Sequence, residues 1–381
     1  MIRKSICFSV SILFSMMMFI SCGGGTSSDP VNPDNEDDDD LNKEWNIVGN
    51  AGFTADWVPN INLAVYDGKP YVIFQDITKT YKATVMKFNG SSWETVGDAG
   101  FSEGTINSPA IVIDTNGTPY VAYNDSDSVI DSITVMKFNG NKWVNVGNSR
   151  FSSGKATDTS LALYDGTPYV SFRDLGNSKK ATVMKFNGTS WVLVGSAGFS
   201  AGEVVETKIV IDSNGILYVS YSDRENSSKI TVMKFNGTSW VNVGSAGFGS
   251  QYSSSPCIVL DSKGTPYLSY VDGTSGKAVV KKFNGTDWVL VGSADFSDGE
   301  IGEISMAFNS KGTPYVVFRD ANCSNNATAM KFNGNKWVNV GSAGFSGGEV
   351  ALTRMAIYND IPYITFQDVD HDYKATVMMF K

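Results

Sequence analysis

The sequence predicts an all-β protein built from seven four-stranded antiparallel units that close into a ring. Two recurring markers and the positions of the chain ends lead to this prediction. The first marker, Trp-x-x-Val-Gly, begins at Trp45, Trp93, Trp143, Trp191, Trp240, Trp288 and Trp337. The second, an aromatic-x-Asp triplet, ends at Asp76, Asp125, Asp174, Asp223, Asp272, Asp320 and Asp368. Both markers occur seven times, and successive Trp markers are 48 to 50 residues apart.

A repeat of this length, made of short β segments, is typical of a β-propeller. In the second repeat, residues 110–114 form a short apolar strand, and residues 119–125 alternate as the next. Residues 133–138 and 143–147 supply the third and fourth strands, with Asn-Gly between them as a hairpin turn. We name these strands A to D, from the ring axis outward. The B–C and D–A loops share one face, called the loop face below.

The two ends of the chain predict how the ring closes. The repeat region opens on a D strand near Trp45, and the chain stops after a C strand at residues 375–380. The last blade therefore lacks a D strand that the first segment can supply. Pairing the two removes an open apolar edge, whereas an open solenoid would leave it exposed.

Residues 44–381 resemble a seven-bladed β-propeller, similar in general plan to the kelch, WD40 and sialidase propellers. Their motifs are absent: residues 114–117 (Asp-Thr-Asn-Gly) place two residues between Asp and Gly, where the Asp-box of sialidases has one. The resemblance therefore implies a fold and transfers no functional residue.

Composition and charge exclude several functions. The formal net charge is −9 and the pI is about 4.8, so electrostatic binding of nucleic acid is not expected. Beyond the leader region the chain has only one His and two Cys, so zinc sites built from Cys and His and catalysis by His are not expected. A disulfide between Cys257 and Cys323 is conceivable in an exported protein, but two separate thiols fit better.

The N-terminal residues predict a targeting segment. Residues 1–21 form a signal peptide with Arg3 and Lys4 before a short apolar run, and the residues before Cys22 resemble a bacterial lipobox. The resemblance implies acylation, such as palmitoylation, of Cys22 and a lipid anchor; an ordinary signal peptide is the alternative. Residues 22–43 read as an acidic, disordered linker, similar to surface-export signals of Bacteroidetes lipoproteins. We expect an envelope protein, anchored in the outer membrane and displayed at the cell surface.

Departures from the repeat indicate candidate ligand-binding residues. Four lie in loops of the first and seventh blades, which become neighbours after closure: Trp57, Tyr81, His371 and Tyr373. Flat aromatics pack on the C–H faces of sugars, although packing on the rim explains Trp57 equally well. Two more, Arg173 and Arg319, occupy the variable middle of the aromatic-x-Asp triplet, where the alternative is a salt bridge with the neighbouring Asp.

Three alternating carboxylates in the last B–C loop suggest a calcium site, and calcium is the only cofactor that the sequence suggests. Asp368, Asp370 and Asp372 alternate in the last B–C loop, as ligands do at the start of Ca²⁺ loops, but the Gly and Glu of such loops are missing. The ring of seven Asp residues allows two interpretations: loop-shaping hydrogen bonds, or acceptors for a cation or for sugar hydroxyls.

The sequence favours a non-enzymatic, membrane-anchored binding protein that recognises a glycan or a protein through its loop face, as in adhesion. No catalytic residue is assigned, and the question of enzyme activity stays open. One alternative is a polysaccharide hydrolase or lyase that uses carboxylates from D–A loops, for which the candidates are Glu203, Glu206, Glu300 and Glu303. Another is a scaffold subunit of an envelope complex.

Overall fold

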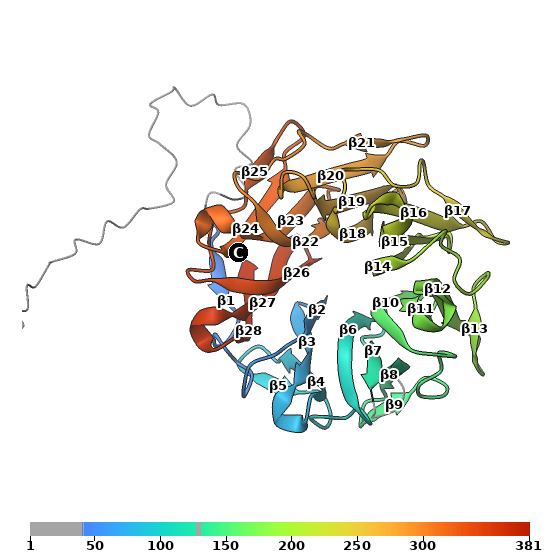
Figure 1. The fold of residues 1–381 in the computed structure, drawn as a ribbon. Coiled ribbons are helices and arrows are strands. Elements are labelled where there is room, and N and C mark those ends of the chain that lie inside the picture. The colour runs from blue at the N-terminus through green and yellow to red at the C-terminus, as the bar shows by residue number, and fades with distance from the viewer. Residues whose placement is uncertain (1–39, 41, 127–130) are drawn as a thin grey trace, which may run out of the picture. The chain divides into compact units, whose positions relative to one another are not determined.

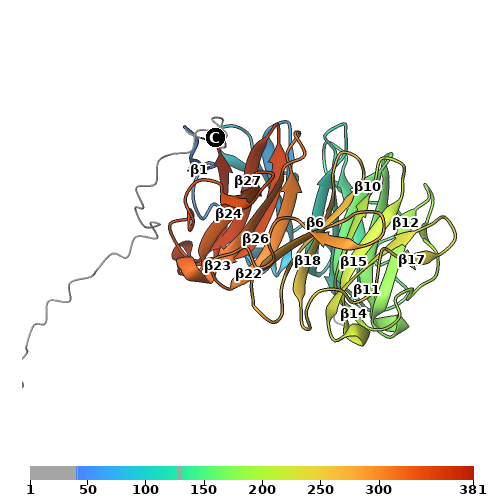
Figure 2. The same ribbon diagram turned by 90° about the horizontal axis from the view of Figure 1, so that it is seen from above.

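The computed structural model describes residue 40, residues 42–126 and residues 131–381. The described residues form seven four-stranded antiparallel sheets arranged as blades around an axis (Figure 1). Figure 2 shows the same blades from the side. Cys22 and the predicted signal peptide and most of the linker lie outside the described residues. Among the described residues, no helix has the length and apolar character needed to cross a membrane.

The strands follow the predicted A–B–C–D order in every blade. They are β2 (Ile61–Tyr66), β3 (Lys69–Asp76), β4 (Lys82–Phe88) and β5 (Trp93–Thr95) in the first blade; β6 (Thr105–Ile113), β7 (Pro119–Ser126), β8 (Asp131–Phe138) and β9 (Trp143–Asn145) in the second; β10 (Ala156–Tyr164), β11 (Thr167–Asp174), β12 (Lys180–Phe186) and β13 (Trp191–Leu193) in the third; β14 (Val204–Ile211), β15 (Leu217–Asp223), β16 (Lys229–Phe235) and β17 (Trp240–Asn242) in the fourth; β18 (Ser254–Leu260), β19 (Pro266–Val271), β20 (Ala278–Phe283) and β21 (Trp288–Leu290) in the fifth; β22 (Ile301–Phe308), β23 (Pro314–Asp320), β24 (Asn326–Phe332) and β25 (Trp337–Asn339) in the sixth; and β26 (Val350–Tyr358), β27 (Ile361–Asp368), β28 (Lys374–Phe380) and β1 (Trp45–Ile47) in the seventh.

The predicted ring closure is confirmed. Strand β1 pairs antiparallel with β28, with Trp45 opposite Phe380 and Ile47 opposite Met378. The seventh sheet therefore has the order β1-β28-β27-β26, and its outer strand comes from the start of the repeat region. Figure 1 shows this junction where blue and red ribbons meet.

The recurring Trp residues pack between blades, as expected. The Trp93 indole Nε1–H donates to the Val48 carbonyl of the preceding blade at 2.9 Å, and the Phe53 ring stacks on Trp93 at 3.9 Å. The same pair of contacts recurs at all seven junctions. The apolar core accordingly consists of clusters that each combine residues of two neighbouring blades.

Two strand boundaries differ from the prediction. The second blade's D strand ends at Asn145, before Gly147, because Gly147 has φ +73° and turns the chain toward the next blade. Its A strand begins at Thr105, earlier than expected, because the strand continues through a β-bulge between Asn107 and Ala110. Similar register shifts occur in the A strands of the third to seventh blades.

Candidate functional site

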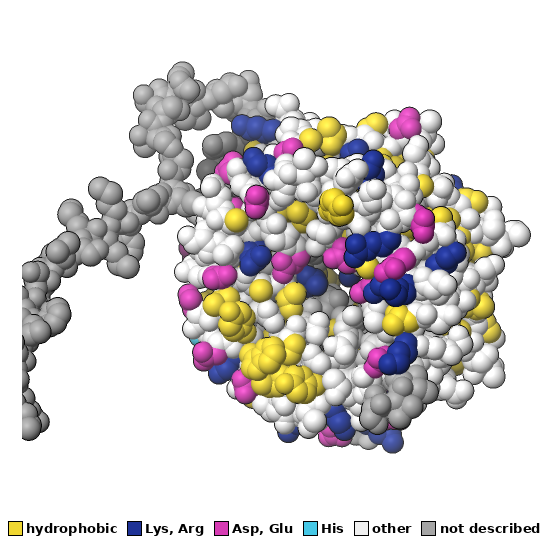
Figure 3. All heavy atoms as spheres, in the orientation of Figure 1, with side chains coloured by type: hydrophobic (Ala, Val, Ile, Leu, Met, Phe, Trp, Pro, Cys, Tyr) yellow, Lys and Arg dark blue, Asp and Glu magenta, His cyan; other side chains and the backbone are white. Residues whose placement is uncertain are grey.

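A cavity of about 480 Å³ occupies the ring axis on the loop face. The first halves of all seven A strands line it. In Figure 3 charged side chains of both signs surround the hollow at the centre of this face. A volume of this size suits a small ligand such as one or two sugar rings.

The sheet register places the lining residues in two tiers. The upper tier lies nearest the loop face, at the A-strand bulges of the second to seventh blades and just before β2 in the first, and it contains Asn60, Ser108, Asp158, Glu206, Ser255, Glu303 and Leu352. The lower tier, two residues further along each strand, contains Asn62, Ala110, Ser160, Lys208, Cys257, Ser305 and Arg354. The cavity is therefore acidic at its mouth and basic at its floor.

The bulges give the upper tier its position. Asp158, Glu206 and Leu352 all have φ between +53° and +58°, the left-handed region that non-glycine residues rarely adopt. The bulge re-aims these side chains toward the axis. Glu206 and Glu303 consequently belong to A strands β14 and β22, whereas the sequence placed them in loops.

Each acidic side chain of the upper tier holds the bulge of a neighbouring blade. Glu206 Oε2 accepts a hydrogen bond from the Ser255 backbone N–H at 2.8 Å, and Asp158 Oδ2 accepts one from the Glu206 N–H at 3.3 Å. The Leu352 N–H donates to Glu303 Oε1 in the same way. These carboxylates therefore fix the shape of the cavity mouth.

The lower tier contains two cations, Lys208 and Arg354. Within the part of the chain that the structure describes, neither Lys208 nor Arg354 forms an ion pair, and Arg354 Nη1 donates only to the Thr353 carbonyl at 2.8 Å. Burial lowers the pKa of Lys208, and the positive charge of Arg354 lowers it further, against the opposing effect of Glu206 and Asp158. Burial likewise lowers the pKa of Arg354, opposed chiefly by Glu303.

The predicted aromatic residues lie on the loop face, and two of them are carried by chain segments that meet. The Val58 N–H donates to the Tyr373 carbonyl at 3.1 Å, so the chain segments that carry Trp57 and Tyr373 meet there; the two residues are 39% and 48% exposed. Tyr81 is 41% exposed at the next junction, where its carbonyl accepts from Ile106 N–H. In Figure 3 apolar side chains gather over the first and seventh blades.

His371 completes the predicted group at the blade junction. Its Nδ1 lies 2.9 Å from Asp368 Oδ2, and its Cβ lies close to Gly52 of the segment that enters the first blade. The structure thus brings His371, Trp57 and Tyr373 to one junction and places Tyr81 one blade further on. None of the four is among the residues that line the axial cavity.

The two predicted arginines occupy the equivalent position of the B strands β11 and β23. Arg173 Nη2 forms an ion pair with Glu203, which precedes the A strand of the next blade. At the equivalent position Gln75 Nε2 donates to the Ile106 carbonyl of the next blade. Arg319 lies across Gly302 of the adjacent strand. Arg173 and Arg319 belong to the third and sixth blades, and neither is among the residues that line the axial cavity.

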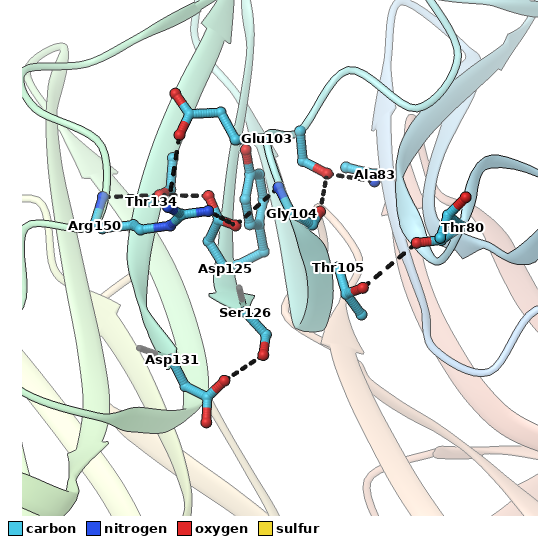
Figure 4. A network of polar contacts seen from close by, with 12 residues as sticks. Thr80, Ala83, Glu103, Gly104, Thr105, Asp125, Ser126, Asp131, Thr134 and Arg150 are labelled. Carbon is cyan, nitrogen blue, oxygen red and sulfur yellow. Dashed lines mark hydrogen bonds and ion pairs between the residues drawn. The ribbon is translucent and has the colours of Figure 1, made fainter. Parts of the chain in front are cut away.

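The seven Asp residues shape the B–C loops. Asp125, fully buried, accepts hydrogen bonds from Thr134 Oγ1 at 3.2 Å, from the Gly104 N–H at 3.1 Å and from Arg150 Nη2 at 3.1 Å (Figure 4). In the other blades with a conserved spacing to Thr, the same bond runs from Thr84, Thr182, Thr231, Thr328 and Thr376. Asp272 instead accepts from backbone N–H groups of its own loop. The geometry fits the loop-shaping interpretation.

The predicted calcium residues surround a short 3₁₀ turn, η6 (Val369–His371). Asp368 accepts from Thr376 Oγ1 at 2.8 Å, and Asp370 lies near Gly348 on another segment. Asp372 ends the turn with φ +57°. Among the described residues, no group of three His, Cys, Asp or Glu side chains is arranged to hold a metal ion. Calcium binding stays a prediction.

The two cysteines form no disulfide in the described chain. Cys257 lies in the lower tier of the cavity and Cys323 in the 3₁₀ turn η5 (Ala321–Cys323). The expectation of separate thiols holds, although Cys257 is only partly buried.

Sequence reasoning missed Lys208 and Arg354. The signal was available in the aligned A strands, where these two long cations replace Asn, Ala, Ser or Cys at one repeat position. A basic residue inside an otherwise apolar strand needs a specific environment.

Comparisons with known proteins support the fold. No protein-family model matches the sequence, and no curated protein matches it. Among solved structures, the chain is similar to an ulvan lyase, a polysaccharide lyase bound to -[GlcA(1-4)Rha3S]-, with a TM-score of 0.56 and 13% identity over 87% of this chain and 94% of the lyase. It is also similar to an arginine-to-alanine mutant of AofleA from Arthrobotrys oligospora, with a TM-score of 0.51 and 11% identity over 79% of this chain and 91% of that one. At these identities the likeness shows the propeller fold alone.

Proposed function

We propose that this protein binds a glycan through the loop face of the propeller, with the axial cavity as its main subsite. The observation that carries the proposal is the cavity itself: about 480 Å³, open on the loop face and lined by polar side chains from several blades. Hydroxyl, amide and carboxylate groups at its mouth match the hydrogen-bonding needs of sugar hydroxyls.

Two further features support a glycan over a protein ligand. The exposed Trp57 and Tyr373 lie on chain segments that meet on the loop face, and each offers a flat apolar surface for sugar C–H groups. The ulvan lyase with a similar fold binds a polysaccharide. Fold likeness is a weak warrant for function by itself, so the cavity and the aromatic pair carry the argument.

A glycan screen tests this proposal. The purified protein is applied to an array of polysaccharides with and without Ca²⁺, beside Trp57→Ala and Tyr252→Ala variants. Tyr252 is the matched control because it is an aromatic of the fifth blade, 69% exposed, and does not line the cavity. We expect saccharide binding that Trp57→Ala weakens by about two- to tenfold, the equivalent of one stacking contact, and that Tyr252→Ala leaves unchanged.

The outcomes separate the candidate functions. Failure of the natively folded protein to bind any saccharide would refute the proposal and favour a scaffold subunit. Binding followed by release of shorter products would make the protein an enzyme. A requirement for Ca²⁺, lost in Asp370→Asn, would support the predicted calcium site.

A polysaccharide lyase is the second candidate, and Lys208 favours it. Its lowered pKa suits a general base that takes the proton beside a uronate carboxyl group. The C–H electrons then form a C=C bond, the glycosidic C–O bond breaks, and the leaving oxygen is protonated from solvent. The test is ultraviolet absorbance of the new double bond during incubation with uronate polysaccharides. A hydrolase fits less well, because the cavity carboxylates already accept backbone N–H groups.

We also propose that the chain is lipid-anchored at Cys22 in the bacterial outer membrane. The lipobox-like residues before Cys22 and the Gly-rich stretch after it support this. Metabolic labelling with a palmitate analogue should mark the protein, and Cys22→Ala should lose the label and leave the membrane fraction. Labelling that persists in Cys22→Ala would contradict the proposal.

A further inference from the structure

The lower tier of the axial cavity contains two positive charges, Lys208 and Arg354, that form no ion pair among the described residues. Its other five residues are small and uncharged, which leaves room for the long side chains of Lys208 and Arg354: Asn62, Ala110, Ser160, Cys257 and Ser305. Both cations are partly buried, and within the described residues neither has a carboxylate within 4 Å.

The carboxylates of the cavity act on the two cations only from beyond ion-pair distance, where they partly offset the effect of burial on the pKa values of Lys208 and Arg354. The carboxylates of Asp158, Glu206 and Glu303 stand one tier higher, where each accepts a backbone N–H of a neighbouring blade. The next positions of the A strands below the cavity are apolar: Ala64, Val112, Ala162, Val210, Val259, Ala307 and Ala356. The two cations therefore mark the polar floor of a cavity that ends in apolar side chains.

Partly buried charges such as those of Lys208 and Arg354 lower the stability of the folded state unless an opposite charge pairs with them. Like charges in one cavity also repel each other, and the positive charge of Arg354 adds to burial in lowering the pKa of Lys208. An anion that reaches the floor would relieve both costs. The planar guanidinium of Arg354 suits carboxylate or sulfate oxygens, and Lys208 adds a second donor group.

We infer that the axial cavity selects an acidic saccharide and that Lys208 and Arg354 bind its carboxylate or sulfate group. The sugar ring then occupies the upper tier, where Asn60, Ser108 and Ser255 face its hydroxyl groups. This inference rests on the proposed function and narrows it to one substrate class.

Three monosaccharide probes and one control variant test the inference. Binding of glucuronate, glucose 6-sulfate and neutral glucose is measured by titration calorimetry, which also separates carboxylate from sulfate recognition. The variants are Lys208→Met and Arg354→Met, with Lys234→Met as the control. Lys234 is partly buried on β16 of the same blade as Lys208 and does not line the cavity.

We expect an acidic probe to bind, glucose to bind at least about tenfold more weakly, and each cavity variant to weaken the acidic probe by about tenfold or more. Lys234→Met should leave binding unchanged. Equal binding of glucose and the acidic probes, unaffected by Lys208→Met, would overturn the inference while leaving the proposed function intact.

A second measurement keeps the inference testable if no saccharide binds. Inorganic sulfate stabilises folded proteins in general. We therefore measure how much more sulfate raises Tm than sodium chloride does at equal ionic strength, and compare this difference between the parent protein and the two cavity variants. A rise that exceeds that of Lys208→Met and Arg354→Met would show that the two cations bind an anion; with no saccharide bound, the proposed function and the choice of a saccharide would both be refuted, and only the anion site would stand. Equal rises in parent and variants refute the anion site. Lys208→Gln replaces Lys208→Met if the latter does not fold.

Discussion

Ring closure through Trp45 gives the most demanding prediction about stability. Trp45 Nε1 donates to the Val340 carbonyl at 2.7 Å across 295 residues of sequence, and its ring stacks on Phe345 at 4.1 Å. Strand β1 has only three residues, so this side chain makes a large share of its contacts. Removing it should release β1 and expose β28 as an open edge.

The expected cost of Trp45→Ala follows from these contacts. Deletion of a large aromatic side chain costs about 3–5 kcal/mol of unfolding free energy. Within that total, the stacked pair with Phe345 contributes about 1 kcal/mol and the hydrogen bond to Val340 about 1 kcal/mol. Trp45→Phe keeps an aromatic ring and loses the indole N–H, so it should cost about 1–2 kcal/mol.

Urea denaturation followed by circular dichroism measures these costs, with Trp191→Ala as the matched control in the middle of the ring. Trp191 makes the same contacts, to the Val146 carbonyl and to Phe151. Both Ala variants should be destabilised, but only Trp45→Ala should self-associate, which light scattering detects. A loss below about 1 kcal/mol in Trp45→Ala, with unchanged scattering, would refute the closure argument.

Three further predictions concern the blades and the cavity. Lys208→Met should stabilise the protein at neutral pH, because it removes an unpaired, partly buried charge. The pKa of Lys208 is lower in the folded than in the unfolded state, so the parent should gain stability as pH rises from the folded pKa toward the ordinary lysine value; thermal melts should show no such gain in Lys208→Met. Asp223→Ala should cost about 3 kcal/mol in urea denaturation, because Thr231 Oγ1 and nearby N–H groups lose a buried acceptor; a loss within 0.5 kcal/mol, as on an open surface, would contradict the loop-shaping role. Gly147→Ala should lower Tm, because φ is +73° and a Cβ there would lie 2.8 Å from the Phe186 ring; an unchanged Tm would show that this junction is not tightly packed.

Much of the fold could be predicted because it repeats. A Trp, a Phe or an Asp that returns every blade is required by a contact that also returns every blade, as the Trp45–Phe345 stack and the Asp125–Thr134 bond illustrate. The missing D strand of the last blade predicted the partner of β28 for the same reason.

The cavity was harder to predict because it depends on register. The bulge at Glu206 moves that residue from an apparent loop onto the wall of the axis, and no local sequence signal marks the two-residue shift between Val205 and Lys208. Arg173 pairs with Glu203 across two blades and thirty residues, so its partner could not be chosen from sequence neighbours. The aromatic residues were chosen because they depart from the repeat in the loops of the first and seventh blades, and a search confined to loops does not reach the A strands that line the cavity.

A crystal structure of the protein with a bound uronic acid disaccharide tests the central claim most directly. The account predicts density in the axial cavity on the loop face, with the carboxylate within hydrogen-bonding distance of Lys208 and Arg354. Density on the opposite face or on the side of a blade, with the axial cavity empty of saccharide, would contradict it.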